Sequence, residues 1–366
     1  MSNQSSDWYV FKGNDEDGKI EVLGLKDGDL PPAPPWRPFG KDKDASSVNR
    51  RKKRGQTFQV REHEKEMINA ALYLRRPLLI TGNPGTGKSS LAYAVARQLE
   101  LGEVLYWPIT TRTVLKDGLY SYDAIARLQD VKEEQDKGIG AYIRLGPLGT
   151  ALMPSNKPRV LIIDEIDKSD IDLPNDLLTV FEEGRFTIPE LERLQVETEV
   201  GTGDTEIQVR TVYTDETEDT TKGDRQTMIT NGVLSCTTFP FIVLTSNGER
   251  DFPAPFLRRC LRLTMQDPDK KMLRNIVKAH FQEQFGEGVI QNEVVKGMIE
   301  AFHKKIASKS QTLATDQLLN AIYMVINEKC NKQITTKEEL DKRLKDNNDL
   351  LAKLMTDLGM VESDFE

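Results

Sequence analysis

The stretch Thr81-Gly82-Asn83-Pro84-Gly85-Thr86-Gly87-Lys88-Ser89-Ser90 decides the fold of this chain. It follows an apolar run at residues 77–80 and precedes a helical pattern at residues 91–99. A G-x-x-x-x-G-K-S spacing between a strand and a helix is typical of a phosphate-binding loop. Its glycines let several N–H groups face one anion, and the next helix adds the positive end of its dipole. A glycine-rich turn that matches by chance is disfavoured by this context.

Single side chains of the loop have expected roles in binding and catalysis. Lys88 can reach the β- and γ-phosphates of a nucleotide, and the Ser89 hydroxyl can hold Mg²⁺. We therefore predict an ATP and Mg²⁺ site. Its predicted nucleotide-binding residues in this loop are Gly82, Asn83, Pro84, Gly85, Thr86, Gly87, Lys88, Ser89 and Ser90.

Composition excludes several other classes of protein. The chain has 366 residues, 38% of them hydrophobic and 30% charged, which is typical of a globular protein. Its formal net charge of −8 argues mildly against a dedicated nucleic-acid binder. Three cysteines and three histidines are scattered and suggest neither a metal site nor disulfides. No apolar run is long enough for a membrane span, and no secretory signal is recognisable, so we expect a cytoplasmic protein.

Residues 1–56 are predicted to be an N-terminal extension. The runs 8–11 and 19–23 resemble two strands of a hairpin. Residues 31–38, Pro-Pro-Ala-Pro-Pro-Trp-Arg-Pro, indicate an extended segment. This segment is either a strap across the next domain or a neighbouring subunit, or a disordered tether. The basic run at residues 49–54 indicates a solvated linker or a contact with phosphate or an acidic surface.

Residues 57–265 are predicted to form an α/β domain with a parallel sheet flanked by helices. The sequence 159–165 is an almost continuous apolar run, which favours a strand buried on both faces. Strands of such a sheet end at one edge, where ligands bind. Each predicted strand ends in polar residues, and the strands are expected at residues 78–81, 104–109, 159–165 and 241–247.

Three polar residues at these strand ends are candidate site residues, Asp164 for binding the nucleotide and its metal and the other two for catalysis. Asp164 is placed to order the Mg²⁺ shell, so that Ser89 and Asp164 are the predicted metal-binding pair. Glu165 is a candidate general base for the attacking water. Asn247 ends a strand predicted to lie between the first and third, where its amide can orient the same water. The alternatives are that the two carboxylates cap a strand and that Asn247 only forms a turn.

Two inserts interrupt the predicted domain. Residues 111–150 form a longer connection than one helix needs, and residues 187–231 are rich in Gly, Thr and acidic residues. Within the second insert, residues 196–200 and 206–210 are predicted to be strands of a projecting acidic hairpin.

Adjacent arginines and a helical region complete the chain. Arg258 and Arg259 lie between apolar residues, which is costly unless they are exposed or paired. A guanidinium offered to a neighbour's γ-phosphate would stabilise the transition state, whereas an intrachain salt bridge is the alternative for one of the two. Residues 266–366 are predicted to be a small α-helical domain with helices near 273–277, 294–305, 316–328 and 337–358.

Together these motifs resemble those of the AAA+ ATPases. Gly82–Ser89 corresponds to Walker A, Leu161–Glu165 to Walker B, Leu244–Asn247 to sensor 1 and Phe256–Arg259 to the arginine finger. Within that class the chain looks most like the MoxR group. The resemblance covers about residues 57–330.

The resemblance implies an AAA+ P-loop NTPase fold with a helical lid, and a ring of usually six subunits that hydrolyses ATP at its interfaces. Lys88, Ser89, Asp164, Glu165 and Asn247 would act in cis, and Arg258 or Arg259 in trans. Relatives of the MoxR group commonly act as chaperone-like remodellers of partners with a von Willebrand A domain. Residues 111–150 would be a helix-2-type insert, and 187–231 a pre-sensor-1 hairpin facing the pore.

One departure concerns the lid. The stretch Thr312–Leu318 has no arginine where MoxR proteins usually carry sensor 2. A slow, nucleotide-switched scaffold therefore stays open beside the remodelling ATPase. A nucleic-acid motor resembling McrB-like proteins is a further alternative, favoured by the basic run and disfavoured by the acidic hairpin and the net charge.

Overall fold

The chain divides into two compact units, residues 51–266 and residues 1–50 with 267–366. The computed structural model describes residues 34, 36, 55–135, 137–197, 204–213, 224–308, 313–327, 334, 336–346 and 349–356. The predicted strands at 8–11 and 19–23, the basic run at 49–54 and the acidic stretch 214–219 lie outside these residues.

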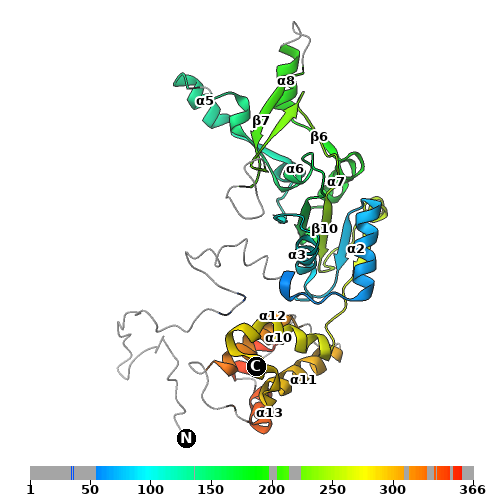
Figure 1. Cartoon of the computed structure of the whole chain (residues 1–366), viewed down its shortest axis with the longest axis vertical. Helices are drawn as coiled ribbons and strands as arrows, with labels where there is room; N and C mark the ends of the chain where they lie inside the picture. The colour runs from blue at the N-terminus through cyan, green and yellow to red at the C-terminus, as the bar shows by residue number, and fades with distance from the viewer. Residues whose placement is uncertain are drawn as a thin grey trace. The chain divides into compact units, whose positions relative to one another are not determined.

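A five-stranded parallel sheet forms the centre of the first unit (Figure 1). The strand order is β11-β1-β10-β5-β2, so that the strand before Asn247 lies between the first and third strands as predicted. Parallel pairing brings the carboxyl ends of the strands to one edge. The strands span β1 (Leu78–Thr81), β2 (Leu105–Pro108), β5 (Val160–Asp164), β10 (Phe241–Ser246) and β11 (Leu261–Thr264).

Both faces of this sheet are buried, which explains its continuous apolar strands. In β5, Leu161 and Ile163 face one hydrophobic layer, whereas Val160 and Ile162 face the other. One layer is completed by helices α2 (Glu62–Leu74) and α3 (Lys88–Gln98). The other layer is completed by helices α6 (Pro147–Ala151), α7 (Asp172–Glu183) and α9 (Ala254–Arg259). These helices contribute Leu148, Leu177 and Phe256, respectively.

Helix α3 differs from expectation at its end. Its sequence pattern predicts a buried stripe of Leu91, Val95 and Leu99. Leu91 and Val95 are buried, but Leu99 is 45% exposed. The physical reason is that the helix ends at Gln98 and Leu99 is its C-cap, beyond the last turn that packs on the sheet.

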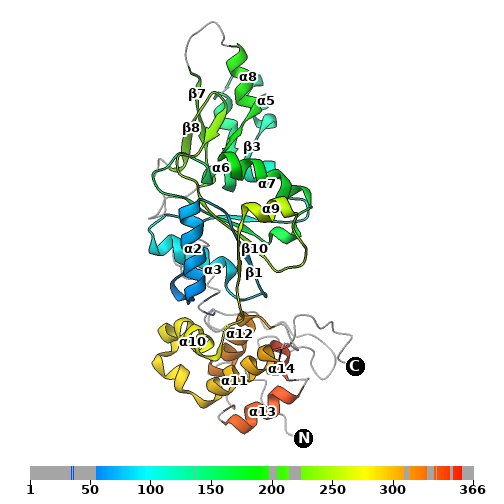
Figure 2. The same cartoon turned by 90° about the vertical axis from the view of Figure 1, so that its right-hand side faces the viewer.

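The two inserts combine into a second sheet that the sequence analysis does not predict. Its strand order is β3-β4-β7-β8-β9-β6. Strands β3 (Tyr120–Tyr122) and β4 (Ile143–Leu145) come from the first insert. Strands β7 (Glu206–Arg210) and β8 (Gln226–Thr230) come from the second, whereas β6 (Arg185–Thr187) and β9 (Val233–Ser235) lie at or just beyond its two ends. Figure 2 shows this sheet with helix α5 (Ala124–Lys132) at one end of the unit.

The predicted strand at residues 196–200 is wrong where the structure describes it. Residues 189–197 form helix α8 (Pro189–Glu197), which begins with a proline and has Glu190 and Glu192 in its first turn. Proline at the start and acidic residues in the first turn both favour a helix. The hairpin partner of β7 is β8, paired from Glu206↔Thr230 to Arg210↔Gln226.

The second unit is helical, as predicted. Its helices are α10 (Lys270–Phe285), α11 (Glu293–Ala307), α12 (Thr315–Ile326), α13 (Lys337–Lys345) and α14 (Leu350–Leu354). The single helix expected at 337–358 is divided in two, because Asp349 accepts a hydrogen bond from the Leu351 N–H and caps a new helix. Within the described residues, no helix combines the length and the apolar character needed to cross a membrane.

Candidate nucleotide-binding site

The phosphate loop connects β1 to α3 and is shaped by close backbone approaches. Gly87 has a φ of 88°, and a Cβ there would lie 2.8 Å from the Phe58 ring. Gly82 has a φ of 148°, and a Cβ there would lie 2.7 Å from the Met265 carbonyl oxygen. Only glycine adopts both conformations without strain. The Thr86 hydroxyl donates to the Asn83 carbonyl at 2.9 Å and closes the turn.

Lys88 is the central cation of the site. Its Nζ donates to the carbonyls of Gly82 (2.7 Å) and Asn83 (3.0 Å) and to Asn247 Oδ1 (2.7 Å). These contacts use all three ammonium protons. Burial lowers the pKa of Lys88, and the negative charges of Asp167, Asp164 and Glu165 oppose that shift. The loop thus holds one positive charge at the edge of the sheet.

Asp164 joins three elements at the end of β5. Its Oδ1 accepts hydrogen bonds from the hydroxyls of Ser89 (2.8 Å) and Thr245 (2.6 Å). Its Oδ2 accepts one from the Tyr106 hydroxyl at 2.7 Å. The predicted metal-binding pair, Ser89 and Asp164, therefore lies together.

Glu165 has an unusual backbone conformation. Its φ of 60° is in the left-handed region, which costs energy for a residue with a side chain. A hydrogen bond from its N–H to Thr245 Oγ1, at 2.9 Å, holds this conformation. Its carboxylate forms an ion pair with Lys168 at 2.7 Å. Because Lys168 bonds Oε2, a general base at this position would accept a proton through Oε1 or after the ion pair opens.

Asn247 is positioned by a buried carboxylate, Asp167, which is only 3% exposed. Asp167 Oδ2 accepts hydrogen bonds from the N–H groups of Asn247 (2.9 Å) and Glu249 (3.1 Å). Because the Asn247 amide oxygen accepts from Lys88, its NH₂ group is left to face another partner. That arrangement fits the predicted role of Asn247 in orienting water.

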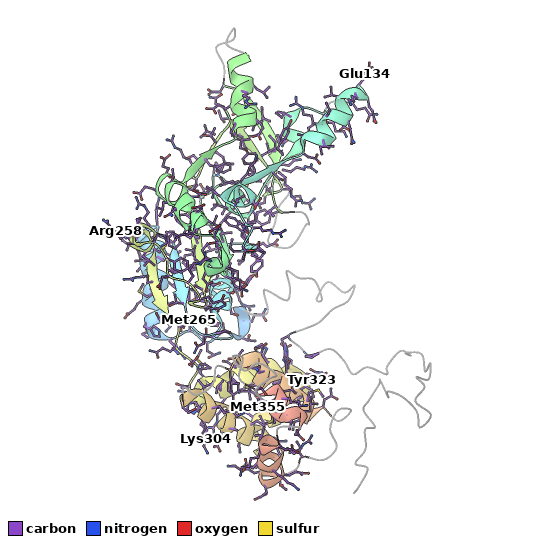
Figure 3. The ribbon with its side chains drawn as sticks, turned by 180° about the vertical axis from the view of Figure 1, so that it is seen from behind. Glu134, Arg258, Met265, Lys304, Tyr323 and Met355 are labelled. Atoms are coloured by element: carbon purple, nitrogen blue, oxygen red, sulfur yellow. The ribbon has the colours of Figure 1, made fainter. Side chains whose placement is uncertain are left out.

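The two arginines differ in their surroundings. Arg259 Nε contacts Glu182 of α7 at 2.9 Å. Arg258 is exposed and has no hydrogen-bond or ion-pair partner among the described residues. Figure 3 shows Arg258 on the outer surface of its unit. The intrachain salt bridge considered for one arginine thus involves Arg259, and Arg258 is the one left available to another molecule.

Three site residues escape the sequence analysis, namely Tyr106, Thr245 and Asp167. Thr245 lies within the predicted strand just before Asn247, and Asp167 follows Asp164 by three residues, so both had a weak local signal. Tyr106 had none, because an aromatic residue in a buried strand is usually a core residue.

The residues present fit Mg²⁺ and a nucleotide. Hydroxyl and carboxylate oxygens are the donors that Mg²⁺ prefers, and it usually binds through one or two carboxylates plus phosphates. Groups of three or more His, Cys, Asp or Glu side chains able to hold a metal ion do not occur in the described part of the chain. The single carboxylate of Asp164 beside Ser89 agrees with a metal shared with phosphate.

Comparisons with known proteins support a nucleotide-binding protein of the AAA+ class. Residues 77–228 match the family model described as AAA domain (dynein-related subfamily). The match includes the phosphate loop and the β5 carboxylates and ends before Asn247 and the arginines. No curated protein matches the chain.

Two solved structures illustrate the similarity. Domain III of the Thermotoga maritima replication initiation protein DnaA has 16% identity and a TM-score of 0.37, over 78% of this chain and 92% of that one. Brucella abortus NtrX in complex with ADP has 15% identity and a TM-score of 0.39, over 79% of this chain and 56% of that one. Because both TM-scores are low, the assignment of the fold rests on the strand order of the sheet and on the family match. The fold is that of an AAA+ P-loop NTPase, and the site is that of a nucleotide-binding ATPase.

Proposed function

We propose that this chain hydrolyses ATP with Mg²⁺ when it assembles into a ring. A ring of six subunits is the expectation from the MoxR resemblance. The observation that carries the proposal is the convergence of Lys88, Asp164, Glu165 and Asn247 at one sheet edge. A site that only binds nucleotide needs neither a strained acidic residue nor an amide beside the lysine.

The chain's own groups have distinct tasks in this reaction. Lys88 exchanges the Gly82 and Asn83 carbonyls for phosphate oxygens. Ser89 and Asp164 would hold Mg²⁺, which would supply positive charge beside the nucleotide phosphates. Glu165 accepts a proton from the attacking water, which Asn247 orients. Arg258 of a neighbouring subunit supplies positive charge to the transition state.

We further propose that the ring remodels or activates a partner protein, in the manner of MoxR-like ATPases. A partner with a von Willebrand A domain is the expectation from that resemblance. The presence of an ATPase site and a separate insert sheet, without a second catalytic centre among the described residues, supports a role that acts on another protein. A pull-down with the Glu165→Gln variant and ATP would identify the partner.

The decisive test is Glu165→Gln. It removes the proposed base but keeps the side-chain size, so ATP should still bind while turnover falls by about 10²–10⁴-fold. Steady-state hydrolysis and nucleotide binding are measured separately, across protein concentrations that span ring assembly. Glu183→Gln, on the exposed end of α7, is the matched control and should retain activity. Full turnover in Glu165→Gln would refute the assignment.

A slow nucleotide-switched scaffold is the second candidate. Two observations favour it: Glu165 is held by Lys168, and the lid stretch Thr312–Leu318 contains no arginine. Wild-type turnover too slow for mechanical work, but altered by partner binding, would support the scaffold. Stimulation by DNA with a steep salt dependence would instead support the nucleic-acid motor.

A further inference from the structure

Trp36 from the N-terminal extension packs among aromatic residues of the helical unit. Its ring lies edge-on to His280 (6.0 Å between ring centroids), Phe281 (5.3 Å) and Tyr323 (5.9 Å). Edge-to-face geometry at these distances is the favourable arrangement for aromatic pairs. The three partners come from α10 and α12, and Figure 3 labels Tyr323 in that unit.

A polar contact adds orientation to this packing. The indole Nε1 of Trp36 donates to Asn320 Oδ1 at 3.3 Å. Phe281 is fully buried and Tyr323 nearly so, which gives the pocket a rigid base. Trp36 itself is half-buried. The Trp36 ring therefore meets an aromatic surface and one hydrogen-bond acceptor, a combination typical of a site that recognises a single side chain.

The residues around Trp36 match this type of recognition. Four prolines, at positions 31, 32, 34 and 35, precede it, and Pro38 follows. Proline-rich segments lose little conformational entropy on binding, and aromatic-lined grooves commonly bind them. Of the predicted strap, the structure describes residues 34 and 36, and Trp36 lies on the helical unit.

We propose that His280, Phe281, Asn320 and Tyr323 form a peptide-binding site for a proline-flanked tryptophan, and that the chain's own Trp36 occupies it. Eighteen residues, 37–54, separate Trp36 from Gly55 of the α/β unit. The extension is thus a second connection to the helical unit besides residues 266–267. Because the occupant is held only by non-covalent contacts, another peptide of the same chemistry can replace it.

The test uses the full chain and a labelled peptide with the sequence of residues 31–38. Trp36→Ala empties the pocket, so this variant should bind the peptide, as measured by fluorescence anisotropy. Wild type should bind it at least about tenfold more weakly, because the tethered segment competes at high effective concentration. A peptide with alanine in place of its tryptophan should not bind to either chain.

Pocket specificity is tested in the Trp36→Ala background. Asn320→Ala should weaken peptide binding, whereas Asn275→Ala, an exposed asparagine on the same helix as His280, should not. Circular dichroism checks folding. Should Trp36→Ala not fold, Trp36→Phe, which keeps a ring but loses the N–H, serves as a weaker internal competitor and should bind the peptide more tightly than wild type. Equal binding to wild type and to the emptied pocket, or equal binding of the alanine peptide, would overturn the proposal.

Discussion

At the scale of single residues, Asp167 holds the loop that carries Asn247. It is buried, its Oδ2 holds two N–H groups of the loop after β10, and its Oδ1 has no hydrogen-bond partner within the described residues. Burying a carboxylate with incomplete hydrogen bonding is costly. The benefit is that Asn247 is held where its amide oxygen meets Lys88. We infer that Asp167 is a positioning residue that acts through Asn247.

Asp167→Ala should lower kcat with little change in KM, and it should cost about 1–3 kcal/mol of stability by leaving N–H groups without acceptors. Asp167→Asn, which keeps an acceptor oxygen, should recover part of the activity. If the residue acts through Asn247, the losses in Asp167→Ala and Asn247→Ala are not additive in the double variant. Additive losses in this double-mutant cycle, measured by steady-state kinetics, would show that Asp167 has a separate role.

At the scale of elements, the two inserts are joined by side chains as well as by strand pairing. The Tyr120 hydroxyl donates to Glu190 at 2.7 Å, and Lys116 lies 3.6 Å from the same carboxylate. The Tyr120 ring also stacks on Phe186. Partial burial pushes the pKa of Glu190 upward, but the bonds from Tyr120 and Lys116 outweigh it and lower the pKa overall. The first insert is thereby fastened to α8.

Tyr120→Phe should reduce stability by about 1 kcal/mol, measured by urea unfolding at neutral pH. Because the folded-state pKa of Glu190 is lowered, its contribution is present above the ordinary glutamate value of 4.5 and is lost as pH falls through the lowered value. The difference between wild type and variant should therefore shrink in acid. Tyr122→Phe is the control, since that hydroxyl accepts a hydrogen bond from Arg127 of its own insert. An equal effect of both changes would contradict this account.

At the scale of the whole molecule, the proposed ring needs a residue that one chain cannot supply to its own site. Arg258 is exposed and Arg259 is paired with Glu182, so the two adjacent arginines have different expected roles. Exposed ion pairs contribute at most about 1 kcal/mol. Loss of Arg259 should therefore be a modest structural change, whereas Arg258 is the expected trans-acting group.

Arg258→Ala should lower turnover by about 10³-fold, and Arg259→Ala should lower it much less. A sharper experiment mixes the two inactive variants Arg258→Ala and Glu165→Gln. Arg258→Ala subunits keep Glu165, and Glu165→Gln subunits keep Arg258, so a mixed ring contains interfaces with both groups intact. Hydrolysis by the mixture should exceed the sum of the two separate variants. A mixture that stays as inactive as its components would argue against action between subunits.

Local patterns determine a large part of this protein. The phosphate loop, the apolar strands and the acidic pair at Asp164 are predictable from sequence because each depends on neighbours within a few residues. Parallel topology then places Asn247 beside them, since buried strands share one carboxyl edge.

Contacts between residues far apart in the sequence were decided only by the tertiary structure. Tyr106 and Thr245 reach Asp164 from 58 and 81 residues away, and those contacts depend on the strand order. The sequence likewise cannot show that two separate inserts share one sheet, that Arg259 rather than Arg258 meets Glu182, or that Trp36 lies on the helical unit. Each of these depends on which distant segments pack together, and the spacing of nearby residues does not determine such contacts.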